Sequence, residues 1–290
     1  MTLRVFIPGD AGAVAVGADA VAAALAEAAR GRNVPLEIIR TGSRGLYWLE
    51  PLVEVATAAG RVAYGPVTAE DAAGLIEAAL GNCAHLLCQG VADDIPWLRR
   101  QTRLTFARCG VVDPRSFDDY CAHDGGQGIA RAIALGPDAT IEQVLQSGLR
   151  GRGGAGFPTG IKWRTVAQAA ADQKYIVCNA DEGDSGTFAD RMIMEGDPFV
   201  VIEGMTIAGL AVGASKGYVY IRSEYPHAIA AMTAACSAAR RGGLLGRRIA
   251  DSSHDFDIEI RASAGAYVCG EETSLLESLE GKRGIVRAKP

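Results

Sequence analysis

Short apolar runs alternate with segments of helical periodicity along most of the chain. Strand-like apolar runs lie at residues 3–7, 35–40, 53–57, 61–64, 174–179, 217–223 and 257–262. Helical patterns lie at residues 17–29, from Thr68 onward, at 165–171, at 198–212, and from Pro226 to Gly242. Residues 96–147 are also expected to be mainly helical, with a break before Pro114. This alternation predicts an α/β protein.

The predicted elements fall into two groups, which we assign to two domains. Residues 1–95 have the order β-α-β-β-α, which predicts a thioredoxin-like domain. In residues 96–290 strands and helices alternate, which predicts a Rossmann-like α/β domain with a mainly parallel sheet and helices on both faces. Ligands of such sheets bind beyond the carboxyl ends of the strands, where segments 179–182 and 269–272 are expected to fall.

The segment from Gly148 to Lys162 is a basic, glycine-rich loop. Six glycines fall within thirteen residues, and Arg150 and Arg152 add positive charge. The backbone N–H groups of such a loop can converge on a phosphate group. The preceding run has helical spacing, with Thr140 as its expected N-cap, whereas the dinucleotide fingerprint requires a strand there. An ordinary Rossmann first turn is therefore disfavoured, and the charges argue against the alternative of a flexible linker.

Composition excludes several classes of protein. The net charge of −5 argues against a nucleic-acid-binding protein, and no apolar run reaches the roughly 18 residues of a membrane span. Seven cysteines without a C-x-x-C pair argue against a disulfide framework and predict a cytoplasmic location. Cys83 and Cys88 are the first cysteines in the chain, so residues 1–90 lack the four ligands of an iron–sulfur cluster. Both are expected to be buried thiols.

Three stretches together identify a family. Residues 148–163, 179–191 and 266–281 resemble, in order and spacing, the motifs of the flavin-carrying, NADH-oxidising subunit of respiratory complex I. The resemblance covers roughly residues 100–290. Within that family the residues of these motifs are most similar to those of the diaphorase (beta) subunit of soluble NAD-dependent, molybdenum-containing formate dehydrogenases. The diaphorase subunit of NAD-reducing hydrogenases follows closely.

The resemblance implies a set of cofactor contacts. The FMN contacts it implies are Gly151, Arg152, Gly153, Lys162, Asn179, Asp181, Glu182, Gly270 and Glu271. The nicotinamide-nucleotide contacts it implies are Gly154, Ala155, Phe157, Asp184, Glu272 and Lys289. Tyr267 would lie near the flavin, and we assign it a catalytic role together with Glu182.

The residues themselves leave alternatives open. Asn179, Asp181 and Glu182 offer acceptors for ribityl hydroxyls, but they could equally form an Asx turn with helix caps. Glu271 and Glu272 stand at a predicted helix start, where the helix dipole favours carboxylates of either an active site or a plain cap.

The function implied is that of a diaphorase subunit. It would exchange a hydride between NAD(H) and FMN and pass single electrons between FMN and iron–sulfur clusters. The implied partners are an iron–sulfur, thioredoxin-like gamma subunit and a molybdenum-containing alpha subunit. The alternatives are a subunit of an NAD-reducing hydrogenase, a subunit of a complex I-type NADH dehydrogenase, and a non-catalytic assembly module.

Three departures from the family pattern stand out. Ser263 occupies a position where the family usually has glycine, so the turn there is expected to be altered. Asp184 stands where glutamate is common, which shortens the reach toward the nucleotide by one methylene. The family's 4Fe–4S cluster domain would follow Pro290, so such a cluster is expected only beyond this sequence.

Overall fold

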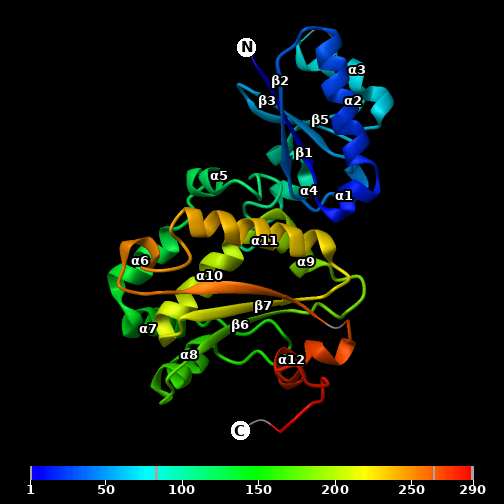
Figure 1. Ribbon diagram of the computed structural model, residues 1–290. Coiled ribbons are helices and arrows are strands. Elements are labelled where there is room, and N and C mark those ends of the chain that lie inside the picture. The colour runs from blue at the N-terminus through cyan, green and yellow to red at the C-terminus, as the bar shows by residue number, and fades with distance from the viewer. Residues whose placement is uncertain (1, 82–83, 264, 289–290) are drawn as a thin grey trace. The chain divides into compact units, whose positions relative to one another are not determined.

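A computed structural model describes residues 2–81, 84–263 and 265–288. The chain divides into two compact units, Met1–Pro114 with Glu195–Asp197, and Arg115–Met194 with Pro198–Pro290. Both are built from sheets and helices (Figure 1), which confirms the predicted α/β class. The boundary we place between residues 95 and 96 stays a prediction.

The first unit is a mixed sheet with helices packed on both of its faces. Its strands are β1 (Leu3–Pro8), β2 (Leu36–Thr41), β3 (Val53–Thr57), β4 (Gly60–Tyr64) and β5 (Cys88–Val91). Its helices are α1 (Ala11–Ala15), α2 (Ala18–Gly31), α3 (Ala72–Ala79) and α4 (Pro96–Arg99), with short 3-10 helices η1 (Tyr47–Leu49), η2 (Ala69–Asp71) and η3 (Ala92–Asp94). The strand order is β2-β1-β3-β4-β5, with β1 and β2 parallel and the other pairs antiparallel. Helices α2 and α3 pack on one face of this sheet, and the short helices α4 and η1 pack on the other.

Alternation along β1 and β3 separates the two faces of this sheet. Val5 and Val55 pack in one cluster with Leu25 of α2 and Leu75 of α3. Glu54, which precedes Val55 in β3, points to the opposite face of the sheet. There its carboxylate forms a buried, bidentate ion pair with Arg44 at 2.5 and 2.9 Å.

The predicted elements of the first unit are largely confirmed. At Thr68, where a helical pattern is predicted to begin, Thr68 and Asp71 form a capping box ahead of α3. Two expectations are wrong. Cys88 is exposed because it opens β5, an edge strand that the apolar pattern does not reveal, and Cys83 lies outside the described residues. Residues 100–116 are irregular rather than helical, and Arg108 within them forms an ion pair with Asp197 at 2.8 Å.

The second unit carries a parallel sheet covered on both faces. Its strands are β6 (Tyr175–Ala180), β7 (Lys216–Ile221) and β8 (Asp257–Ala262), in that order and all parallel. Its helices are α5 (Phe117–Ala122), α6 (Gln127–Leu135), α7 (Pro137–Gln146), α8 (Thr159–Gln168), α9 (Ala189–Gly196), α10 (Pro198–Val212), α11 (Pro226–Arg241) and α12 (Glu272–Leu279), with 3-10 helices η4 (Ile249–Asp251) and η5 (Tyr267–Gly270).

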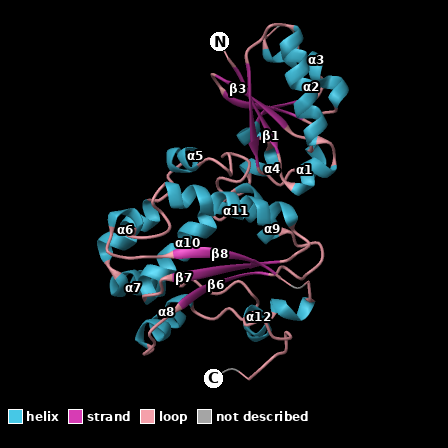
Figure 2. Cartoon of the chain, in the orientation of Figure 1, coloured by secondary structure: helices cyan, strands magenta, loops and turns pink. Residues whose placement is uncertain are grey.

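Successive residues of β7 point to opposite faces of this sheet. Val219 and Ile221 join the core cluster that includes residues of α10 and α11, whereas Tyr220 packs with Leu275 of α12. Figures 1 and 2 show the three strands side by side with α10 and α11 on one side and α12 on the other. The predicted parallel sheet with helices on both faces is confirmed for this unit. Among the described helices, none has the length and apolar character that crossing a membrane requires.

Two helix boundaries differ from the prediction. Helix α7 begins at Pro137 after Gly136, whose φ of 81° suits only glycine, so Thr140 lies inside the helix rather than capping it. Helix α8 begins at Thr159, six residues before the predicted start. The helical lead-in to the glycine-rich loop is nevertheless confirmed, and no strand of the described residues directly precedes that loop.

Candidate functional site

A cavity of about 890 Å³ lies at the carboxyl edge of the β6–β8 sheet, within the second unit. Its lining comes from the glycine-rich loop, from the segment after β6 and the start of α9, and from η5. The lining residues are Arg152, Gly153, Gly154, Asn179, Asp181, Glu182, Gly183, Asp184, Thr187, Ala189, Asp190, Tyr267, Val268, Gly270 and Glu271. Three stretches that are far apart in sequence therefore meet at one pocket.

The glycine-rich loop is closed at its base and open at its tip. The Gly151 N–H donates to the Phe157 carbonyl at 2.9 Å, and the Thr159 N–H donates to the Leu149 carbonyl at the same distance. At the tip, Gly154 has a φ of 95°, and a Cβ added there would meet no atom within 4 Å. The tip therefore needs glycine for its backbone conformation and leaves its surface accessible to a ligand.

Arg152 is the cation that the loop brings to the cavity. Its side chain is exposed, and no hydrogen bond or ion pair of the described residues involves its guanidinium. An exposed guanidinium beside backbone N–H groups suits an anionic group such as a phosphate. Lys162 lies in the first turn of α8, is also exposed, and is not among the lining residues.

Asn179 and Asp181 connect the end of β6 to its neighbours. The Asn179 side-chain amide donates to the Gly270 carbonyl at 2.8 Å, which ties β6 to η5. The buried Asp181 carboxylate accepts from the Ser263 hydroxyl at 2.9 Å. Burial raises the pKa of Asp181, while the Ser263 hydrogen bond and the nearby Arg222 charge oppose the rise.

Glu182 is buried and organises the start of α9. One carboxylate oxygen accepts from the Asp190 N–H at 3.0 Å, and the other accepts from the Arg191 N–H at 3.3 Å and from the Tyr225 hydroxyl at 3.2 Å. The Arg222 guanidinium donates to its backbone carbonyl. Both oxygens are thus held inside the protein, so the cap interpretation of this acid is confirmed.

Asp184 and Tyr267 meet at the mouth of the cavity. The Tyr267 hydroxyl donates to Asp184 at 3.1 Å, and both side chains are exposed. A Cβ at Gly183 would come within 2.8 Å of the Tyr267 ring. Glycine at this position therefore lets the tyrosine ring lie against the backbone beside the cavity.

Glu271 caps helix α12. Its carboxylate accepts from the backbone N–H groups of Thr273 at 2.8 Å and Ser274 at 3.0 Å. Glu272 is the first residue of the helix, exposed, and not among the lining residues. The sequence alone does not distinguish the roles of these two adjacent acids, but the structure does. Glu271 lines the pocket and caps α12, whereas Glu272 is not among the lining residues.

Comparison with known proteins decides the family. Residues 144–290 match the family described as the Nuo51 FMN-binding domain, which spans the glycine-rich loop, the segment after β6 and the α12 region. This chain belongs to the Nuo51 FMN-binding domain family. The predicted membership of the complex I flavin-subunit family is confirmed, and FMN is the cofactor of that family.

Similar proteins in this family include hydrogenase subunits and NADH-quinone oxidoreductase subunits. The chain is 54% identical over 192 residues to the NADP-reducing hydrogenase subunit HndC of Solidesulfovibrio fructosivorans, covering 66% of this chain and 39% of that protein. It is 46% identical over 198 residues to an NADH-quinone oxidoreductase subunit of Aquifex aeolicus, covering 68% and 46%. It is 47% identical over 182 residues to the NAD-reducing hydrogenase HoxS subunit alpha of Cupriavidus necator, covering 62% and 28%.

Similarity to solved structures extends along nearly the whole chain. One such structure is the H2-reduced crystal structure of an NAD+-reducing NiFe-hydrogenase, with a TM-score of 0.50 and 28% sequence identity over 99% of this chain and 47% of that one. The chain spans less than half the length of these relatives.

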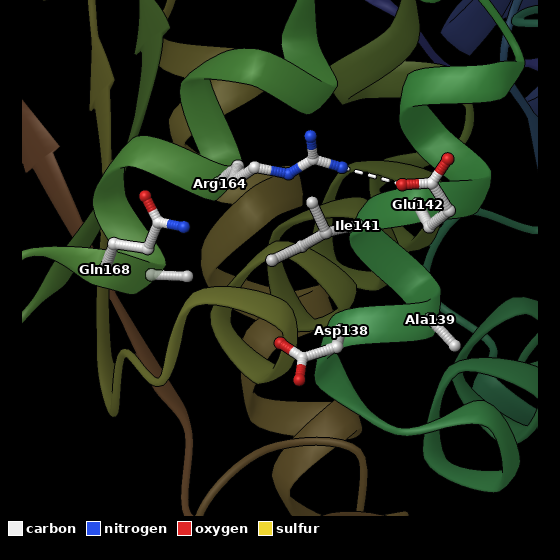
Figure 3. Close-up of a pocket in the computed structure, with 7 residues that line it drawn as sticks. Asp138, Ala139, Ile141, Glu142, Arg164 and Gln168 are labelled. Atoms are coloured by element: carbon white, nitrogen blue, oxygen red, sulfur yellow. Dashed lines mark hydrogen bonds and ion pairs between the residues drawn. The ribbon is translucent and has the colours of Figure 1, made fainter.

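The cavity fits the cofactor of the family. Its volume of about 890 Å³ lies within the range of cofactor and small-molecule sites. It offers an exposed guanidinium, an open glycine tip and several carboxylate and amide acceptors, a donor and acceptor set that suits a phosphorylated, hydroxyl-rich ligand. A second hollow, of about 430 Å³ between α7 and α8, contains none of the predicted site residues, and its Arg164 is already paired with Glu142 at 2.7 Å (Figure 3).

The structure gathers most, but not all, of the predicted site residues at the cavity. Those that line it are Arg152, Gly153, Gly154, Asn179, Asp181, Glu182, Asp184, Tyr267, Gly270 and Glu271. Those outside the lining are Gly151, Ala155, Phe157, Lys162 and Glu272. Lys289 lies outside the described residues.

Sequence reasoning missed five lining residues, namely Gly183, Thr187, Ala189, Asp190 and Val268. All five lie within the motifs that carry the family resemblance. They could have been found because they neighbour residues that were predicted to line the site. The pKa of Asp190 is raised by burial and then by the neighbouring Glu182.

Proposed function

We propose that the cavity holds FMN and that the chain exchanges a hydride between NAD(H) and this flavin as the diaphorase part of a larger enzyme. One observation carries the proposal: three motifs that are distant in sequence converge on a single pocket at the carboxyl edge of a parallel sheet. The names of the relatives, which are NADH-quinone oxidoreductase and NAD(P)-reducing hydrogenase subunits, support the nucleotide substrate.

The residues of the chain bind and orient the flavin, which when bound supplies the conversion between hydride and single-electron transfer. Arg152 and the glycine tip would hold its phosphate, with Lys162 at the start of α8 adding charge. Asn179 and Asp181 would accept hydrogen bonds from hydroxyl or ring N–H groups. Glu182 keeps α9 in place behind them.

The nicotinamide nucleotide would approach from the side of Asp184 and Tyr267, which are exposed at the mouth of the cavity. Gly154, Ala155, Phe157, Glu272 and Lys289 complete the proposed nucleotide site. The Phe157 side chain is half exposed, which leaves an aromatic face open to a planar ring.

For the rest of the enzyme we propose two candidate complexes. The hydrogenase relatives favour an NAD(P)-reducing hydrogenase. A formate dehydrogenase with an iron–sulfur gamma subunit and a molybdenum-containing alpha subunit is supported by the residues of the motifs alone. Identification of nickel or molybdenum in the subunits that co-purify with this chain would separate the two.

We assign residues 1–95 to a thioredoxin-like domain that binds no cluster and docks a partner subunit. The parallel β1–β2 pair beside the antiparallel β3–β4 hairpin supports the fold. In the loop after β2, where related domains of the family carry cluster cysteines, Ser43 instead donates a buried hydrogen bond of 2.7 Å to Glu50. Trp48 and Trp97, 57% and 55% exposed with ring centroids 5.5 Å apart, support docking through this surface.

The identity of the flavin is the first test. The full chain, mixed with FMN or FAD and freed of unbound flavin, is expected to retain FMN at a stoichiometry near one and to release it unchanged on acid treatment. The bound flavin is measured by absorbance and chromatography. Preferential retention of FAD would contradict the cofactor, and retention of neither flavin would favour the alternative of a non-catalytic assembly module.

Asp184 is expected to contribute to nucleotide selectivity. A carboxylate near the adenosine ribose accepts from a 2′-OH and repels a 2′-phosphate. Asp184→Asn should therefore lower the ratio of the NADPH and NADH dissociation constants roughly fivefold, as expected for about 1 kcal/mol of screened repulsion. Glu272→Gln should act in the same direction, and Asp138→Asn, a carboxylate of the second hollow, serves as control. An unchanged ratio in both variants would remove these acids from the nucleotide site.

A further inference from the structure

Asp181, which lines the cavity, accepts a hydrogen bond from the hydroxyl of Ser263, which does not line it. Ser263 follows β8 and is 5% exposed, and Asp181 follows β6 and is 7% exposed. The Ser263 Oγ donates to Asp181 Oδ1 at 2.9 Å and accepts from the Gly265 N–H at 3.1 Å. Because β7 lies between β6 and β8, this hydroxyl links the two outer strands across the carboxyl edge of the sheet.

The link leaves the two oxygens of Asp181 in different environments. Oδ1 is tied to Ser263, inside the protein. Oδ2 lies on the side of Gly270, since a Cβ added to that glycine would stand 3.9 Å from Oδ2 and 3.2 Å from the Asp181 carbonyl oxygen. Gly270 and Asp181 both line the cavity. Fixing Oδ1 therefore presents Oδ2 toward the space in which a ligand would lie.

The surroundings of Asp181 make its charge sensitive to this one donor. Burial favours the neutral acid, whereas the Ser263 hydrogen bond and the Arg222 charge favour the carboxylate, and Glu224 opposes it. The other charged residues that line the cavity are Arg152, Glu182, Asp184, Asp190 and Glu271. Arg222, the basic residue that favours the charged form of Asp181, forms an ion pair with Glu224 at 3.2 Å and donates a hydrogen bond to the Glu182 carbonyl. Ser263 is thus a side-chain hydrogen-bond donor to this carboxylate, and its hydroxyl also interacts with Tyr220.

We propose that Ser263 is a positioning residue of the flavin site: its hydroxyl holds Asp181 ionised and oriented so that Oδ2 accepts a hydrogen bond from FMN. This inference rests on the proposed function of the cavity. Ser263 itself contacts no ligand. Its effect passes through the geometry and charge of Asp181.

The test is an FMN titration of the full chain by flavin fluorescence, repeated from neutral pH down to the lowest pH at which the chain stays folded. Protonation of Asp181 removes its negative charge as an acceptor, so affinity falls as pH falls through the pKa of this carboxyl. Ser263→Ala removes a donor to the charged form and raises that pKa, so the loss of affinity should begin about one pH unit higher. Where the carboxyl is protonated in the variant but still ionised in the wild type, the variant should bind FMN up to about tenfold more weakly, and the two affinities should converge at higher pH.

Companion variants distinguish this role from a purely structural one. Ser263→Cys, which keeps size but donates weakly, should shift the pH profile by a smaller amount in the same direction. In the Asp181→Asn background, Ser263→Ala should cause no further shift in the pH profile. Ser223→Ala, just after the end of β7 and bonded to Glu224, is the matched control. The phosphate of FMN also changes its protonation in this pH range, and it does so equally for every variant. The informative quantity is therefore the difference between the affinity-against-pH curves of a variant and the wild type.

The outcomes separate the two claims. Equal pH profiles for the wild type and Ser263→Ala, with FMN bound by both, would overturn the role of Ser263 and leave the proposed function standing. A uniform loss of affinity at every pH would also overturn it, because it indicates a structural defect alone. Failure of the wild type to bind FMN at any pH would overturn both.

Discussion

Glu182→Ala is expected to destabilise the second unit and to abolish retention of FMN. Removal of the carboxylate leaves the part-buried Asp190 and Arg191 N–H groups and the buried Tyr225 hydroxyl without this acceptor. We expect a loss of about 2–4 kcal/mol in the free energy of unfolding. In calorimetry this corresponds to a melting temperature lower by roughly 5–15 °C.

Two further substitutions calibrate this result. Glu182→Gln keeps one acceptor oxygen but turns an NH2 group toward a donor, so its melting temperature should fall between those of the wild type and Glu182→Ala. Glu142→Ala removes an acid of the same unit from an exposed ion pair with Arg164 and should change stability by less than about 1 kcal/mol. A Glu182→Ala protein that melts like the Glu142→Ala control would contradict the bracing role of Glu182.

Arg152→Ala should weaken FMN binding about 10- to 100-fold without lowering the melting temperature. The guanidinium is exposed and forms no hydrogen bond or ion pair with the described residues that the substitution could remove, whereas a charge-assisted hydrogen bond to a phosphate contributes about 1.5–3 kcal/mol. Because the interaction is ionic, wild-type affinity should fall more steeply with added salt than that of the variant.

The matched control for this variant is Arg164→Ala, which removes a guanidinium from the α7–α8 hollow of the same unit. It should leave both the affinity for FMN and its salt dependence unchanged. If Arg152→Ala and Arg164→Ala bind FMN equally well, then Arg152 does not hold the phosphate.

Local sequence signals were enough to predict the frame of the second unit. Helix α10 begins at Pro198 and ends before Gly213, and its apolar run between these residues marks both ends. The alternation of apolar runs likewise located β6, β7 and β8. Because both 179–182 and 269–272 follow or flank strand ends, their meeting at one edge could be anticipated from the rule for parallel sheets.

Features of the structure that depend on contacts between residues distant in sequence could not be predicted from local patterns. Helix α8 includes Gly160, a poor helix residue, because a Cβ there would come within 2.5 Å of the Leu145 backbone in α7. Helix α9 is capped by Glu182, which lies seven residues before its first residue. Which of Glu271 and Glu272 faces the pocket depends on where α12 begins, and no local pattern fixes that to one residue.

The most direct measurement of the central claim is an experimentally determined structure of the full chain with FMN bound. The account predicts flavin density in the cavity between the Arg152–Gly154 tip and the Asn179–Glu182 segment, with its phosphate near Arg152 and a polar atom within hydrogen-bond distance of Asp181 Oδ2. FMN bound at any other place on the chain, or in this cavity with its phosphate remote from the glycine-rich loop, would contradict it.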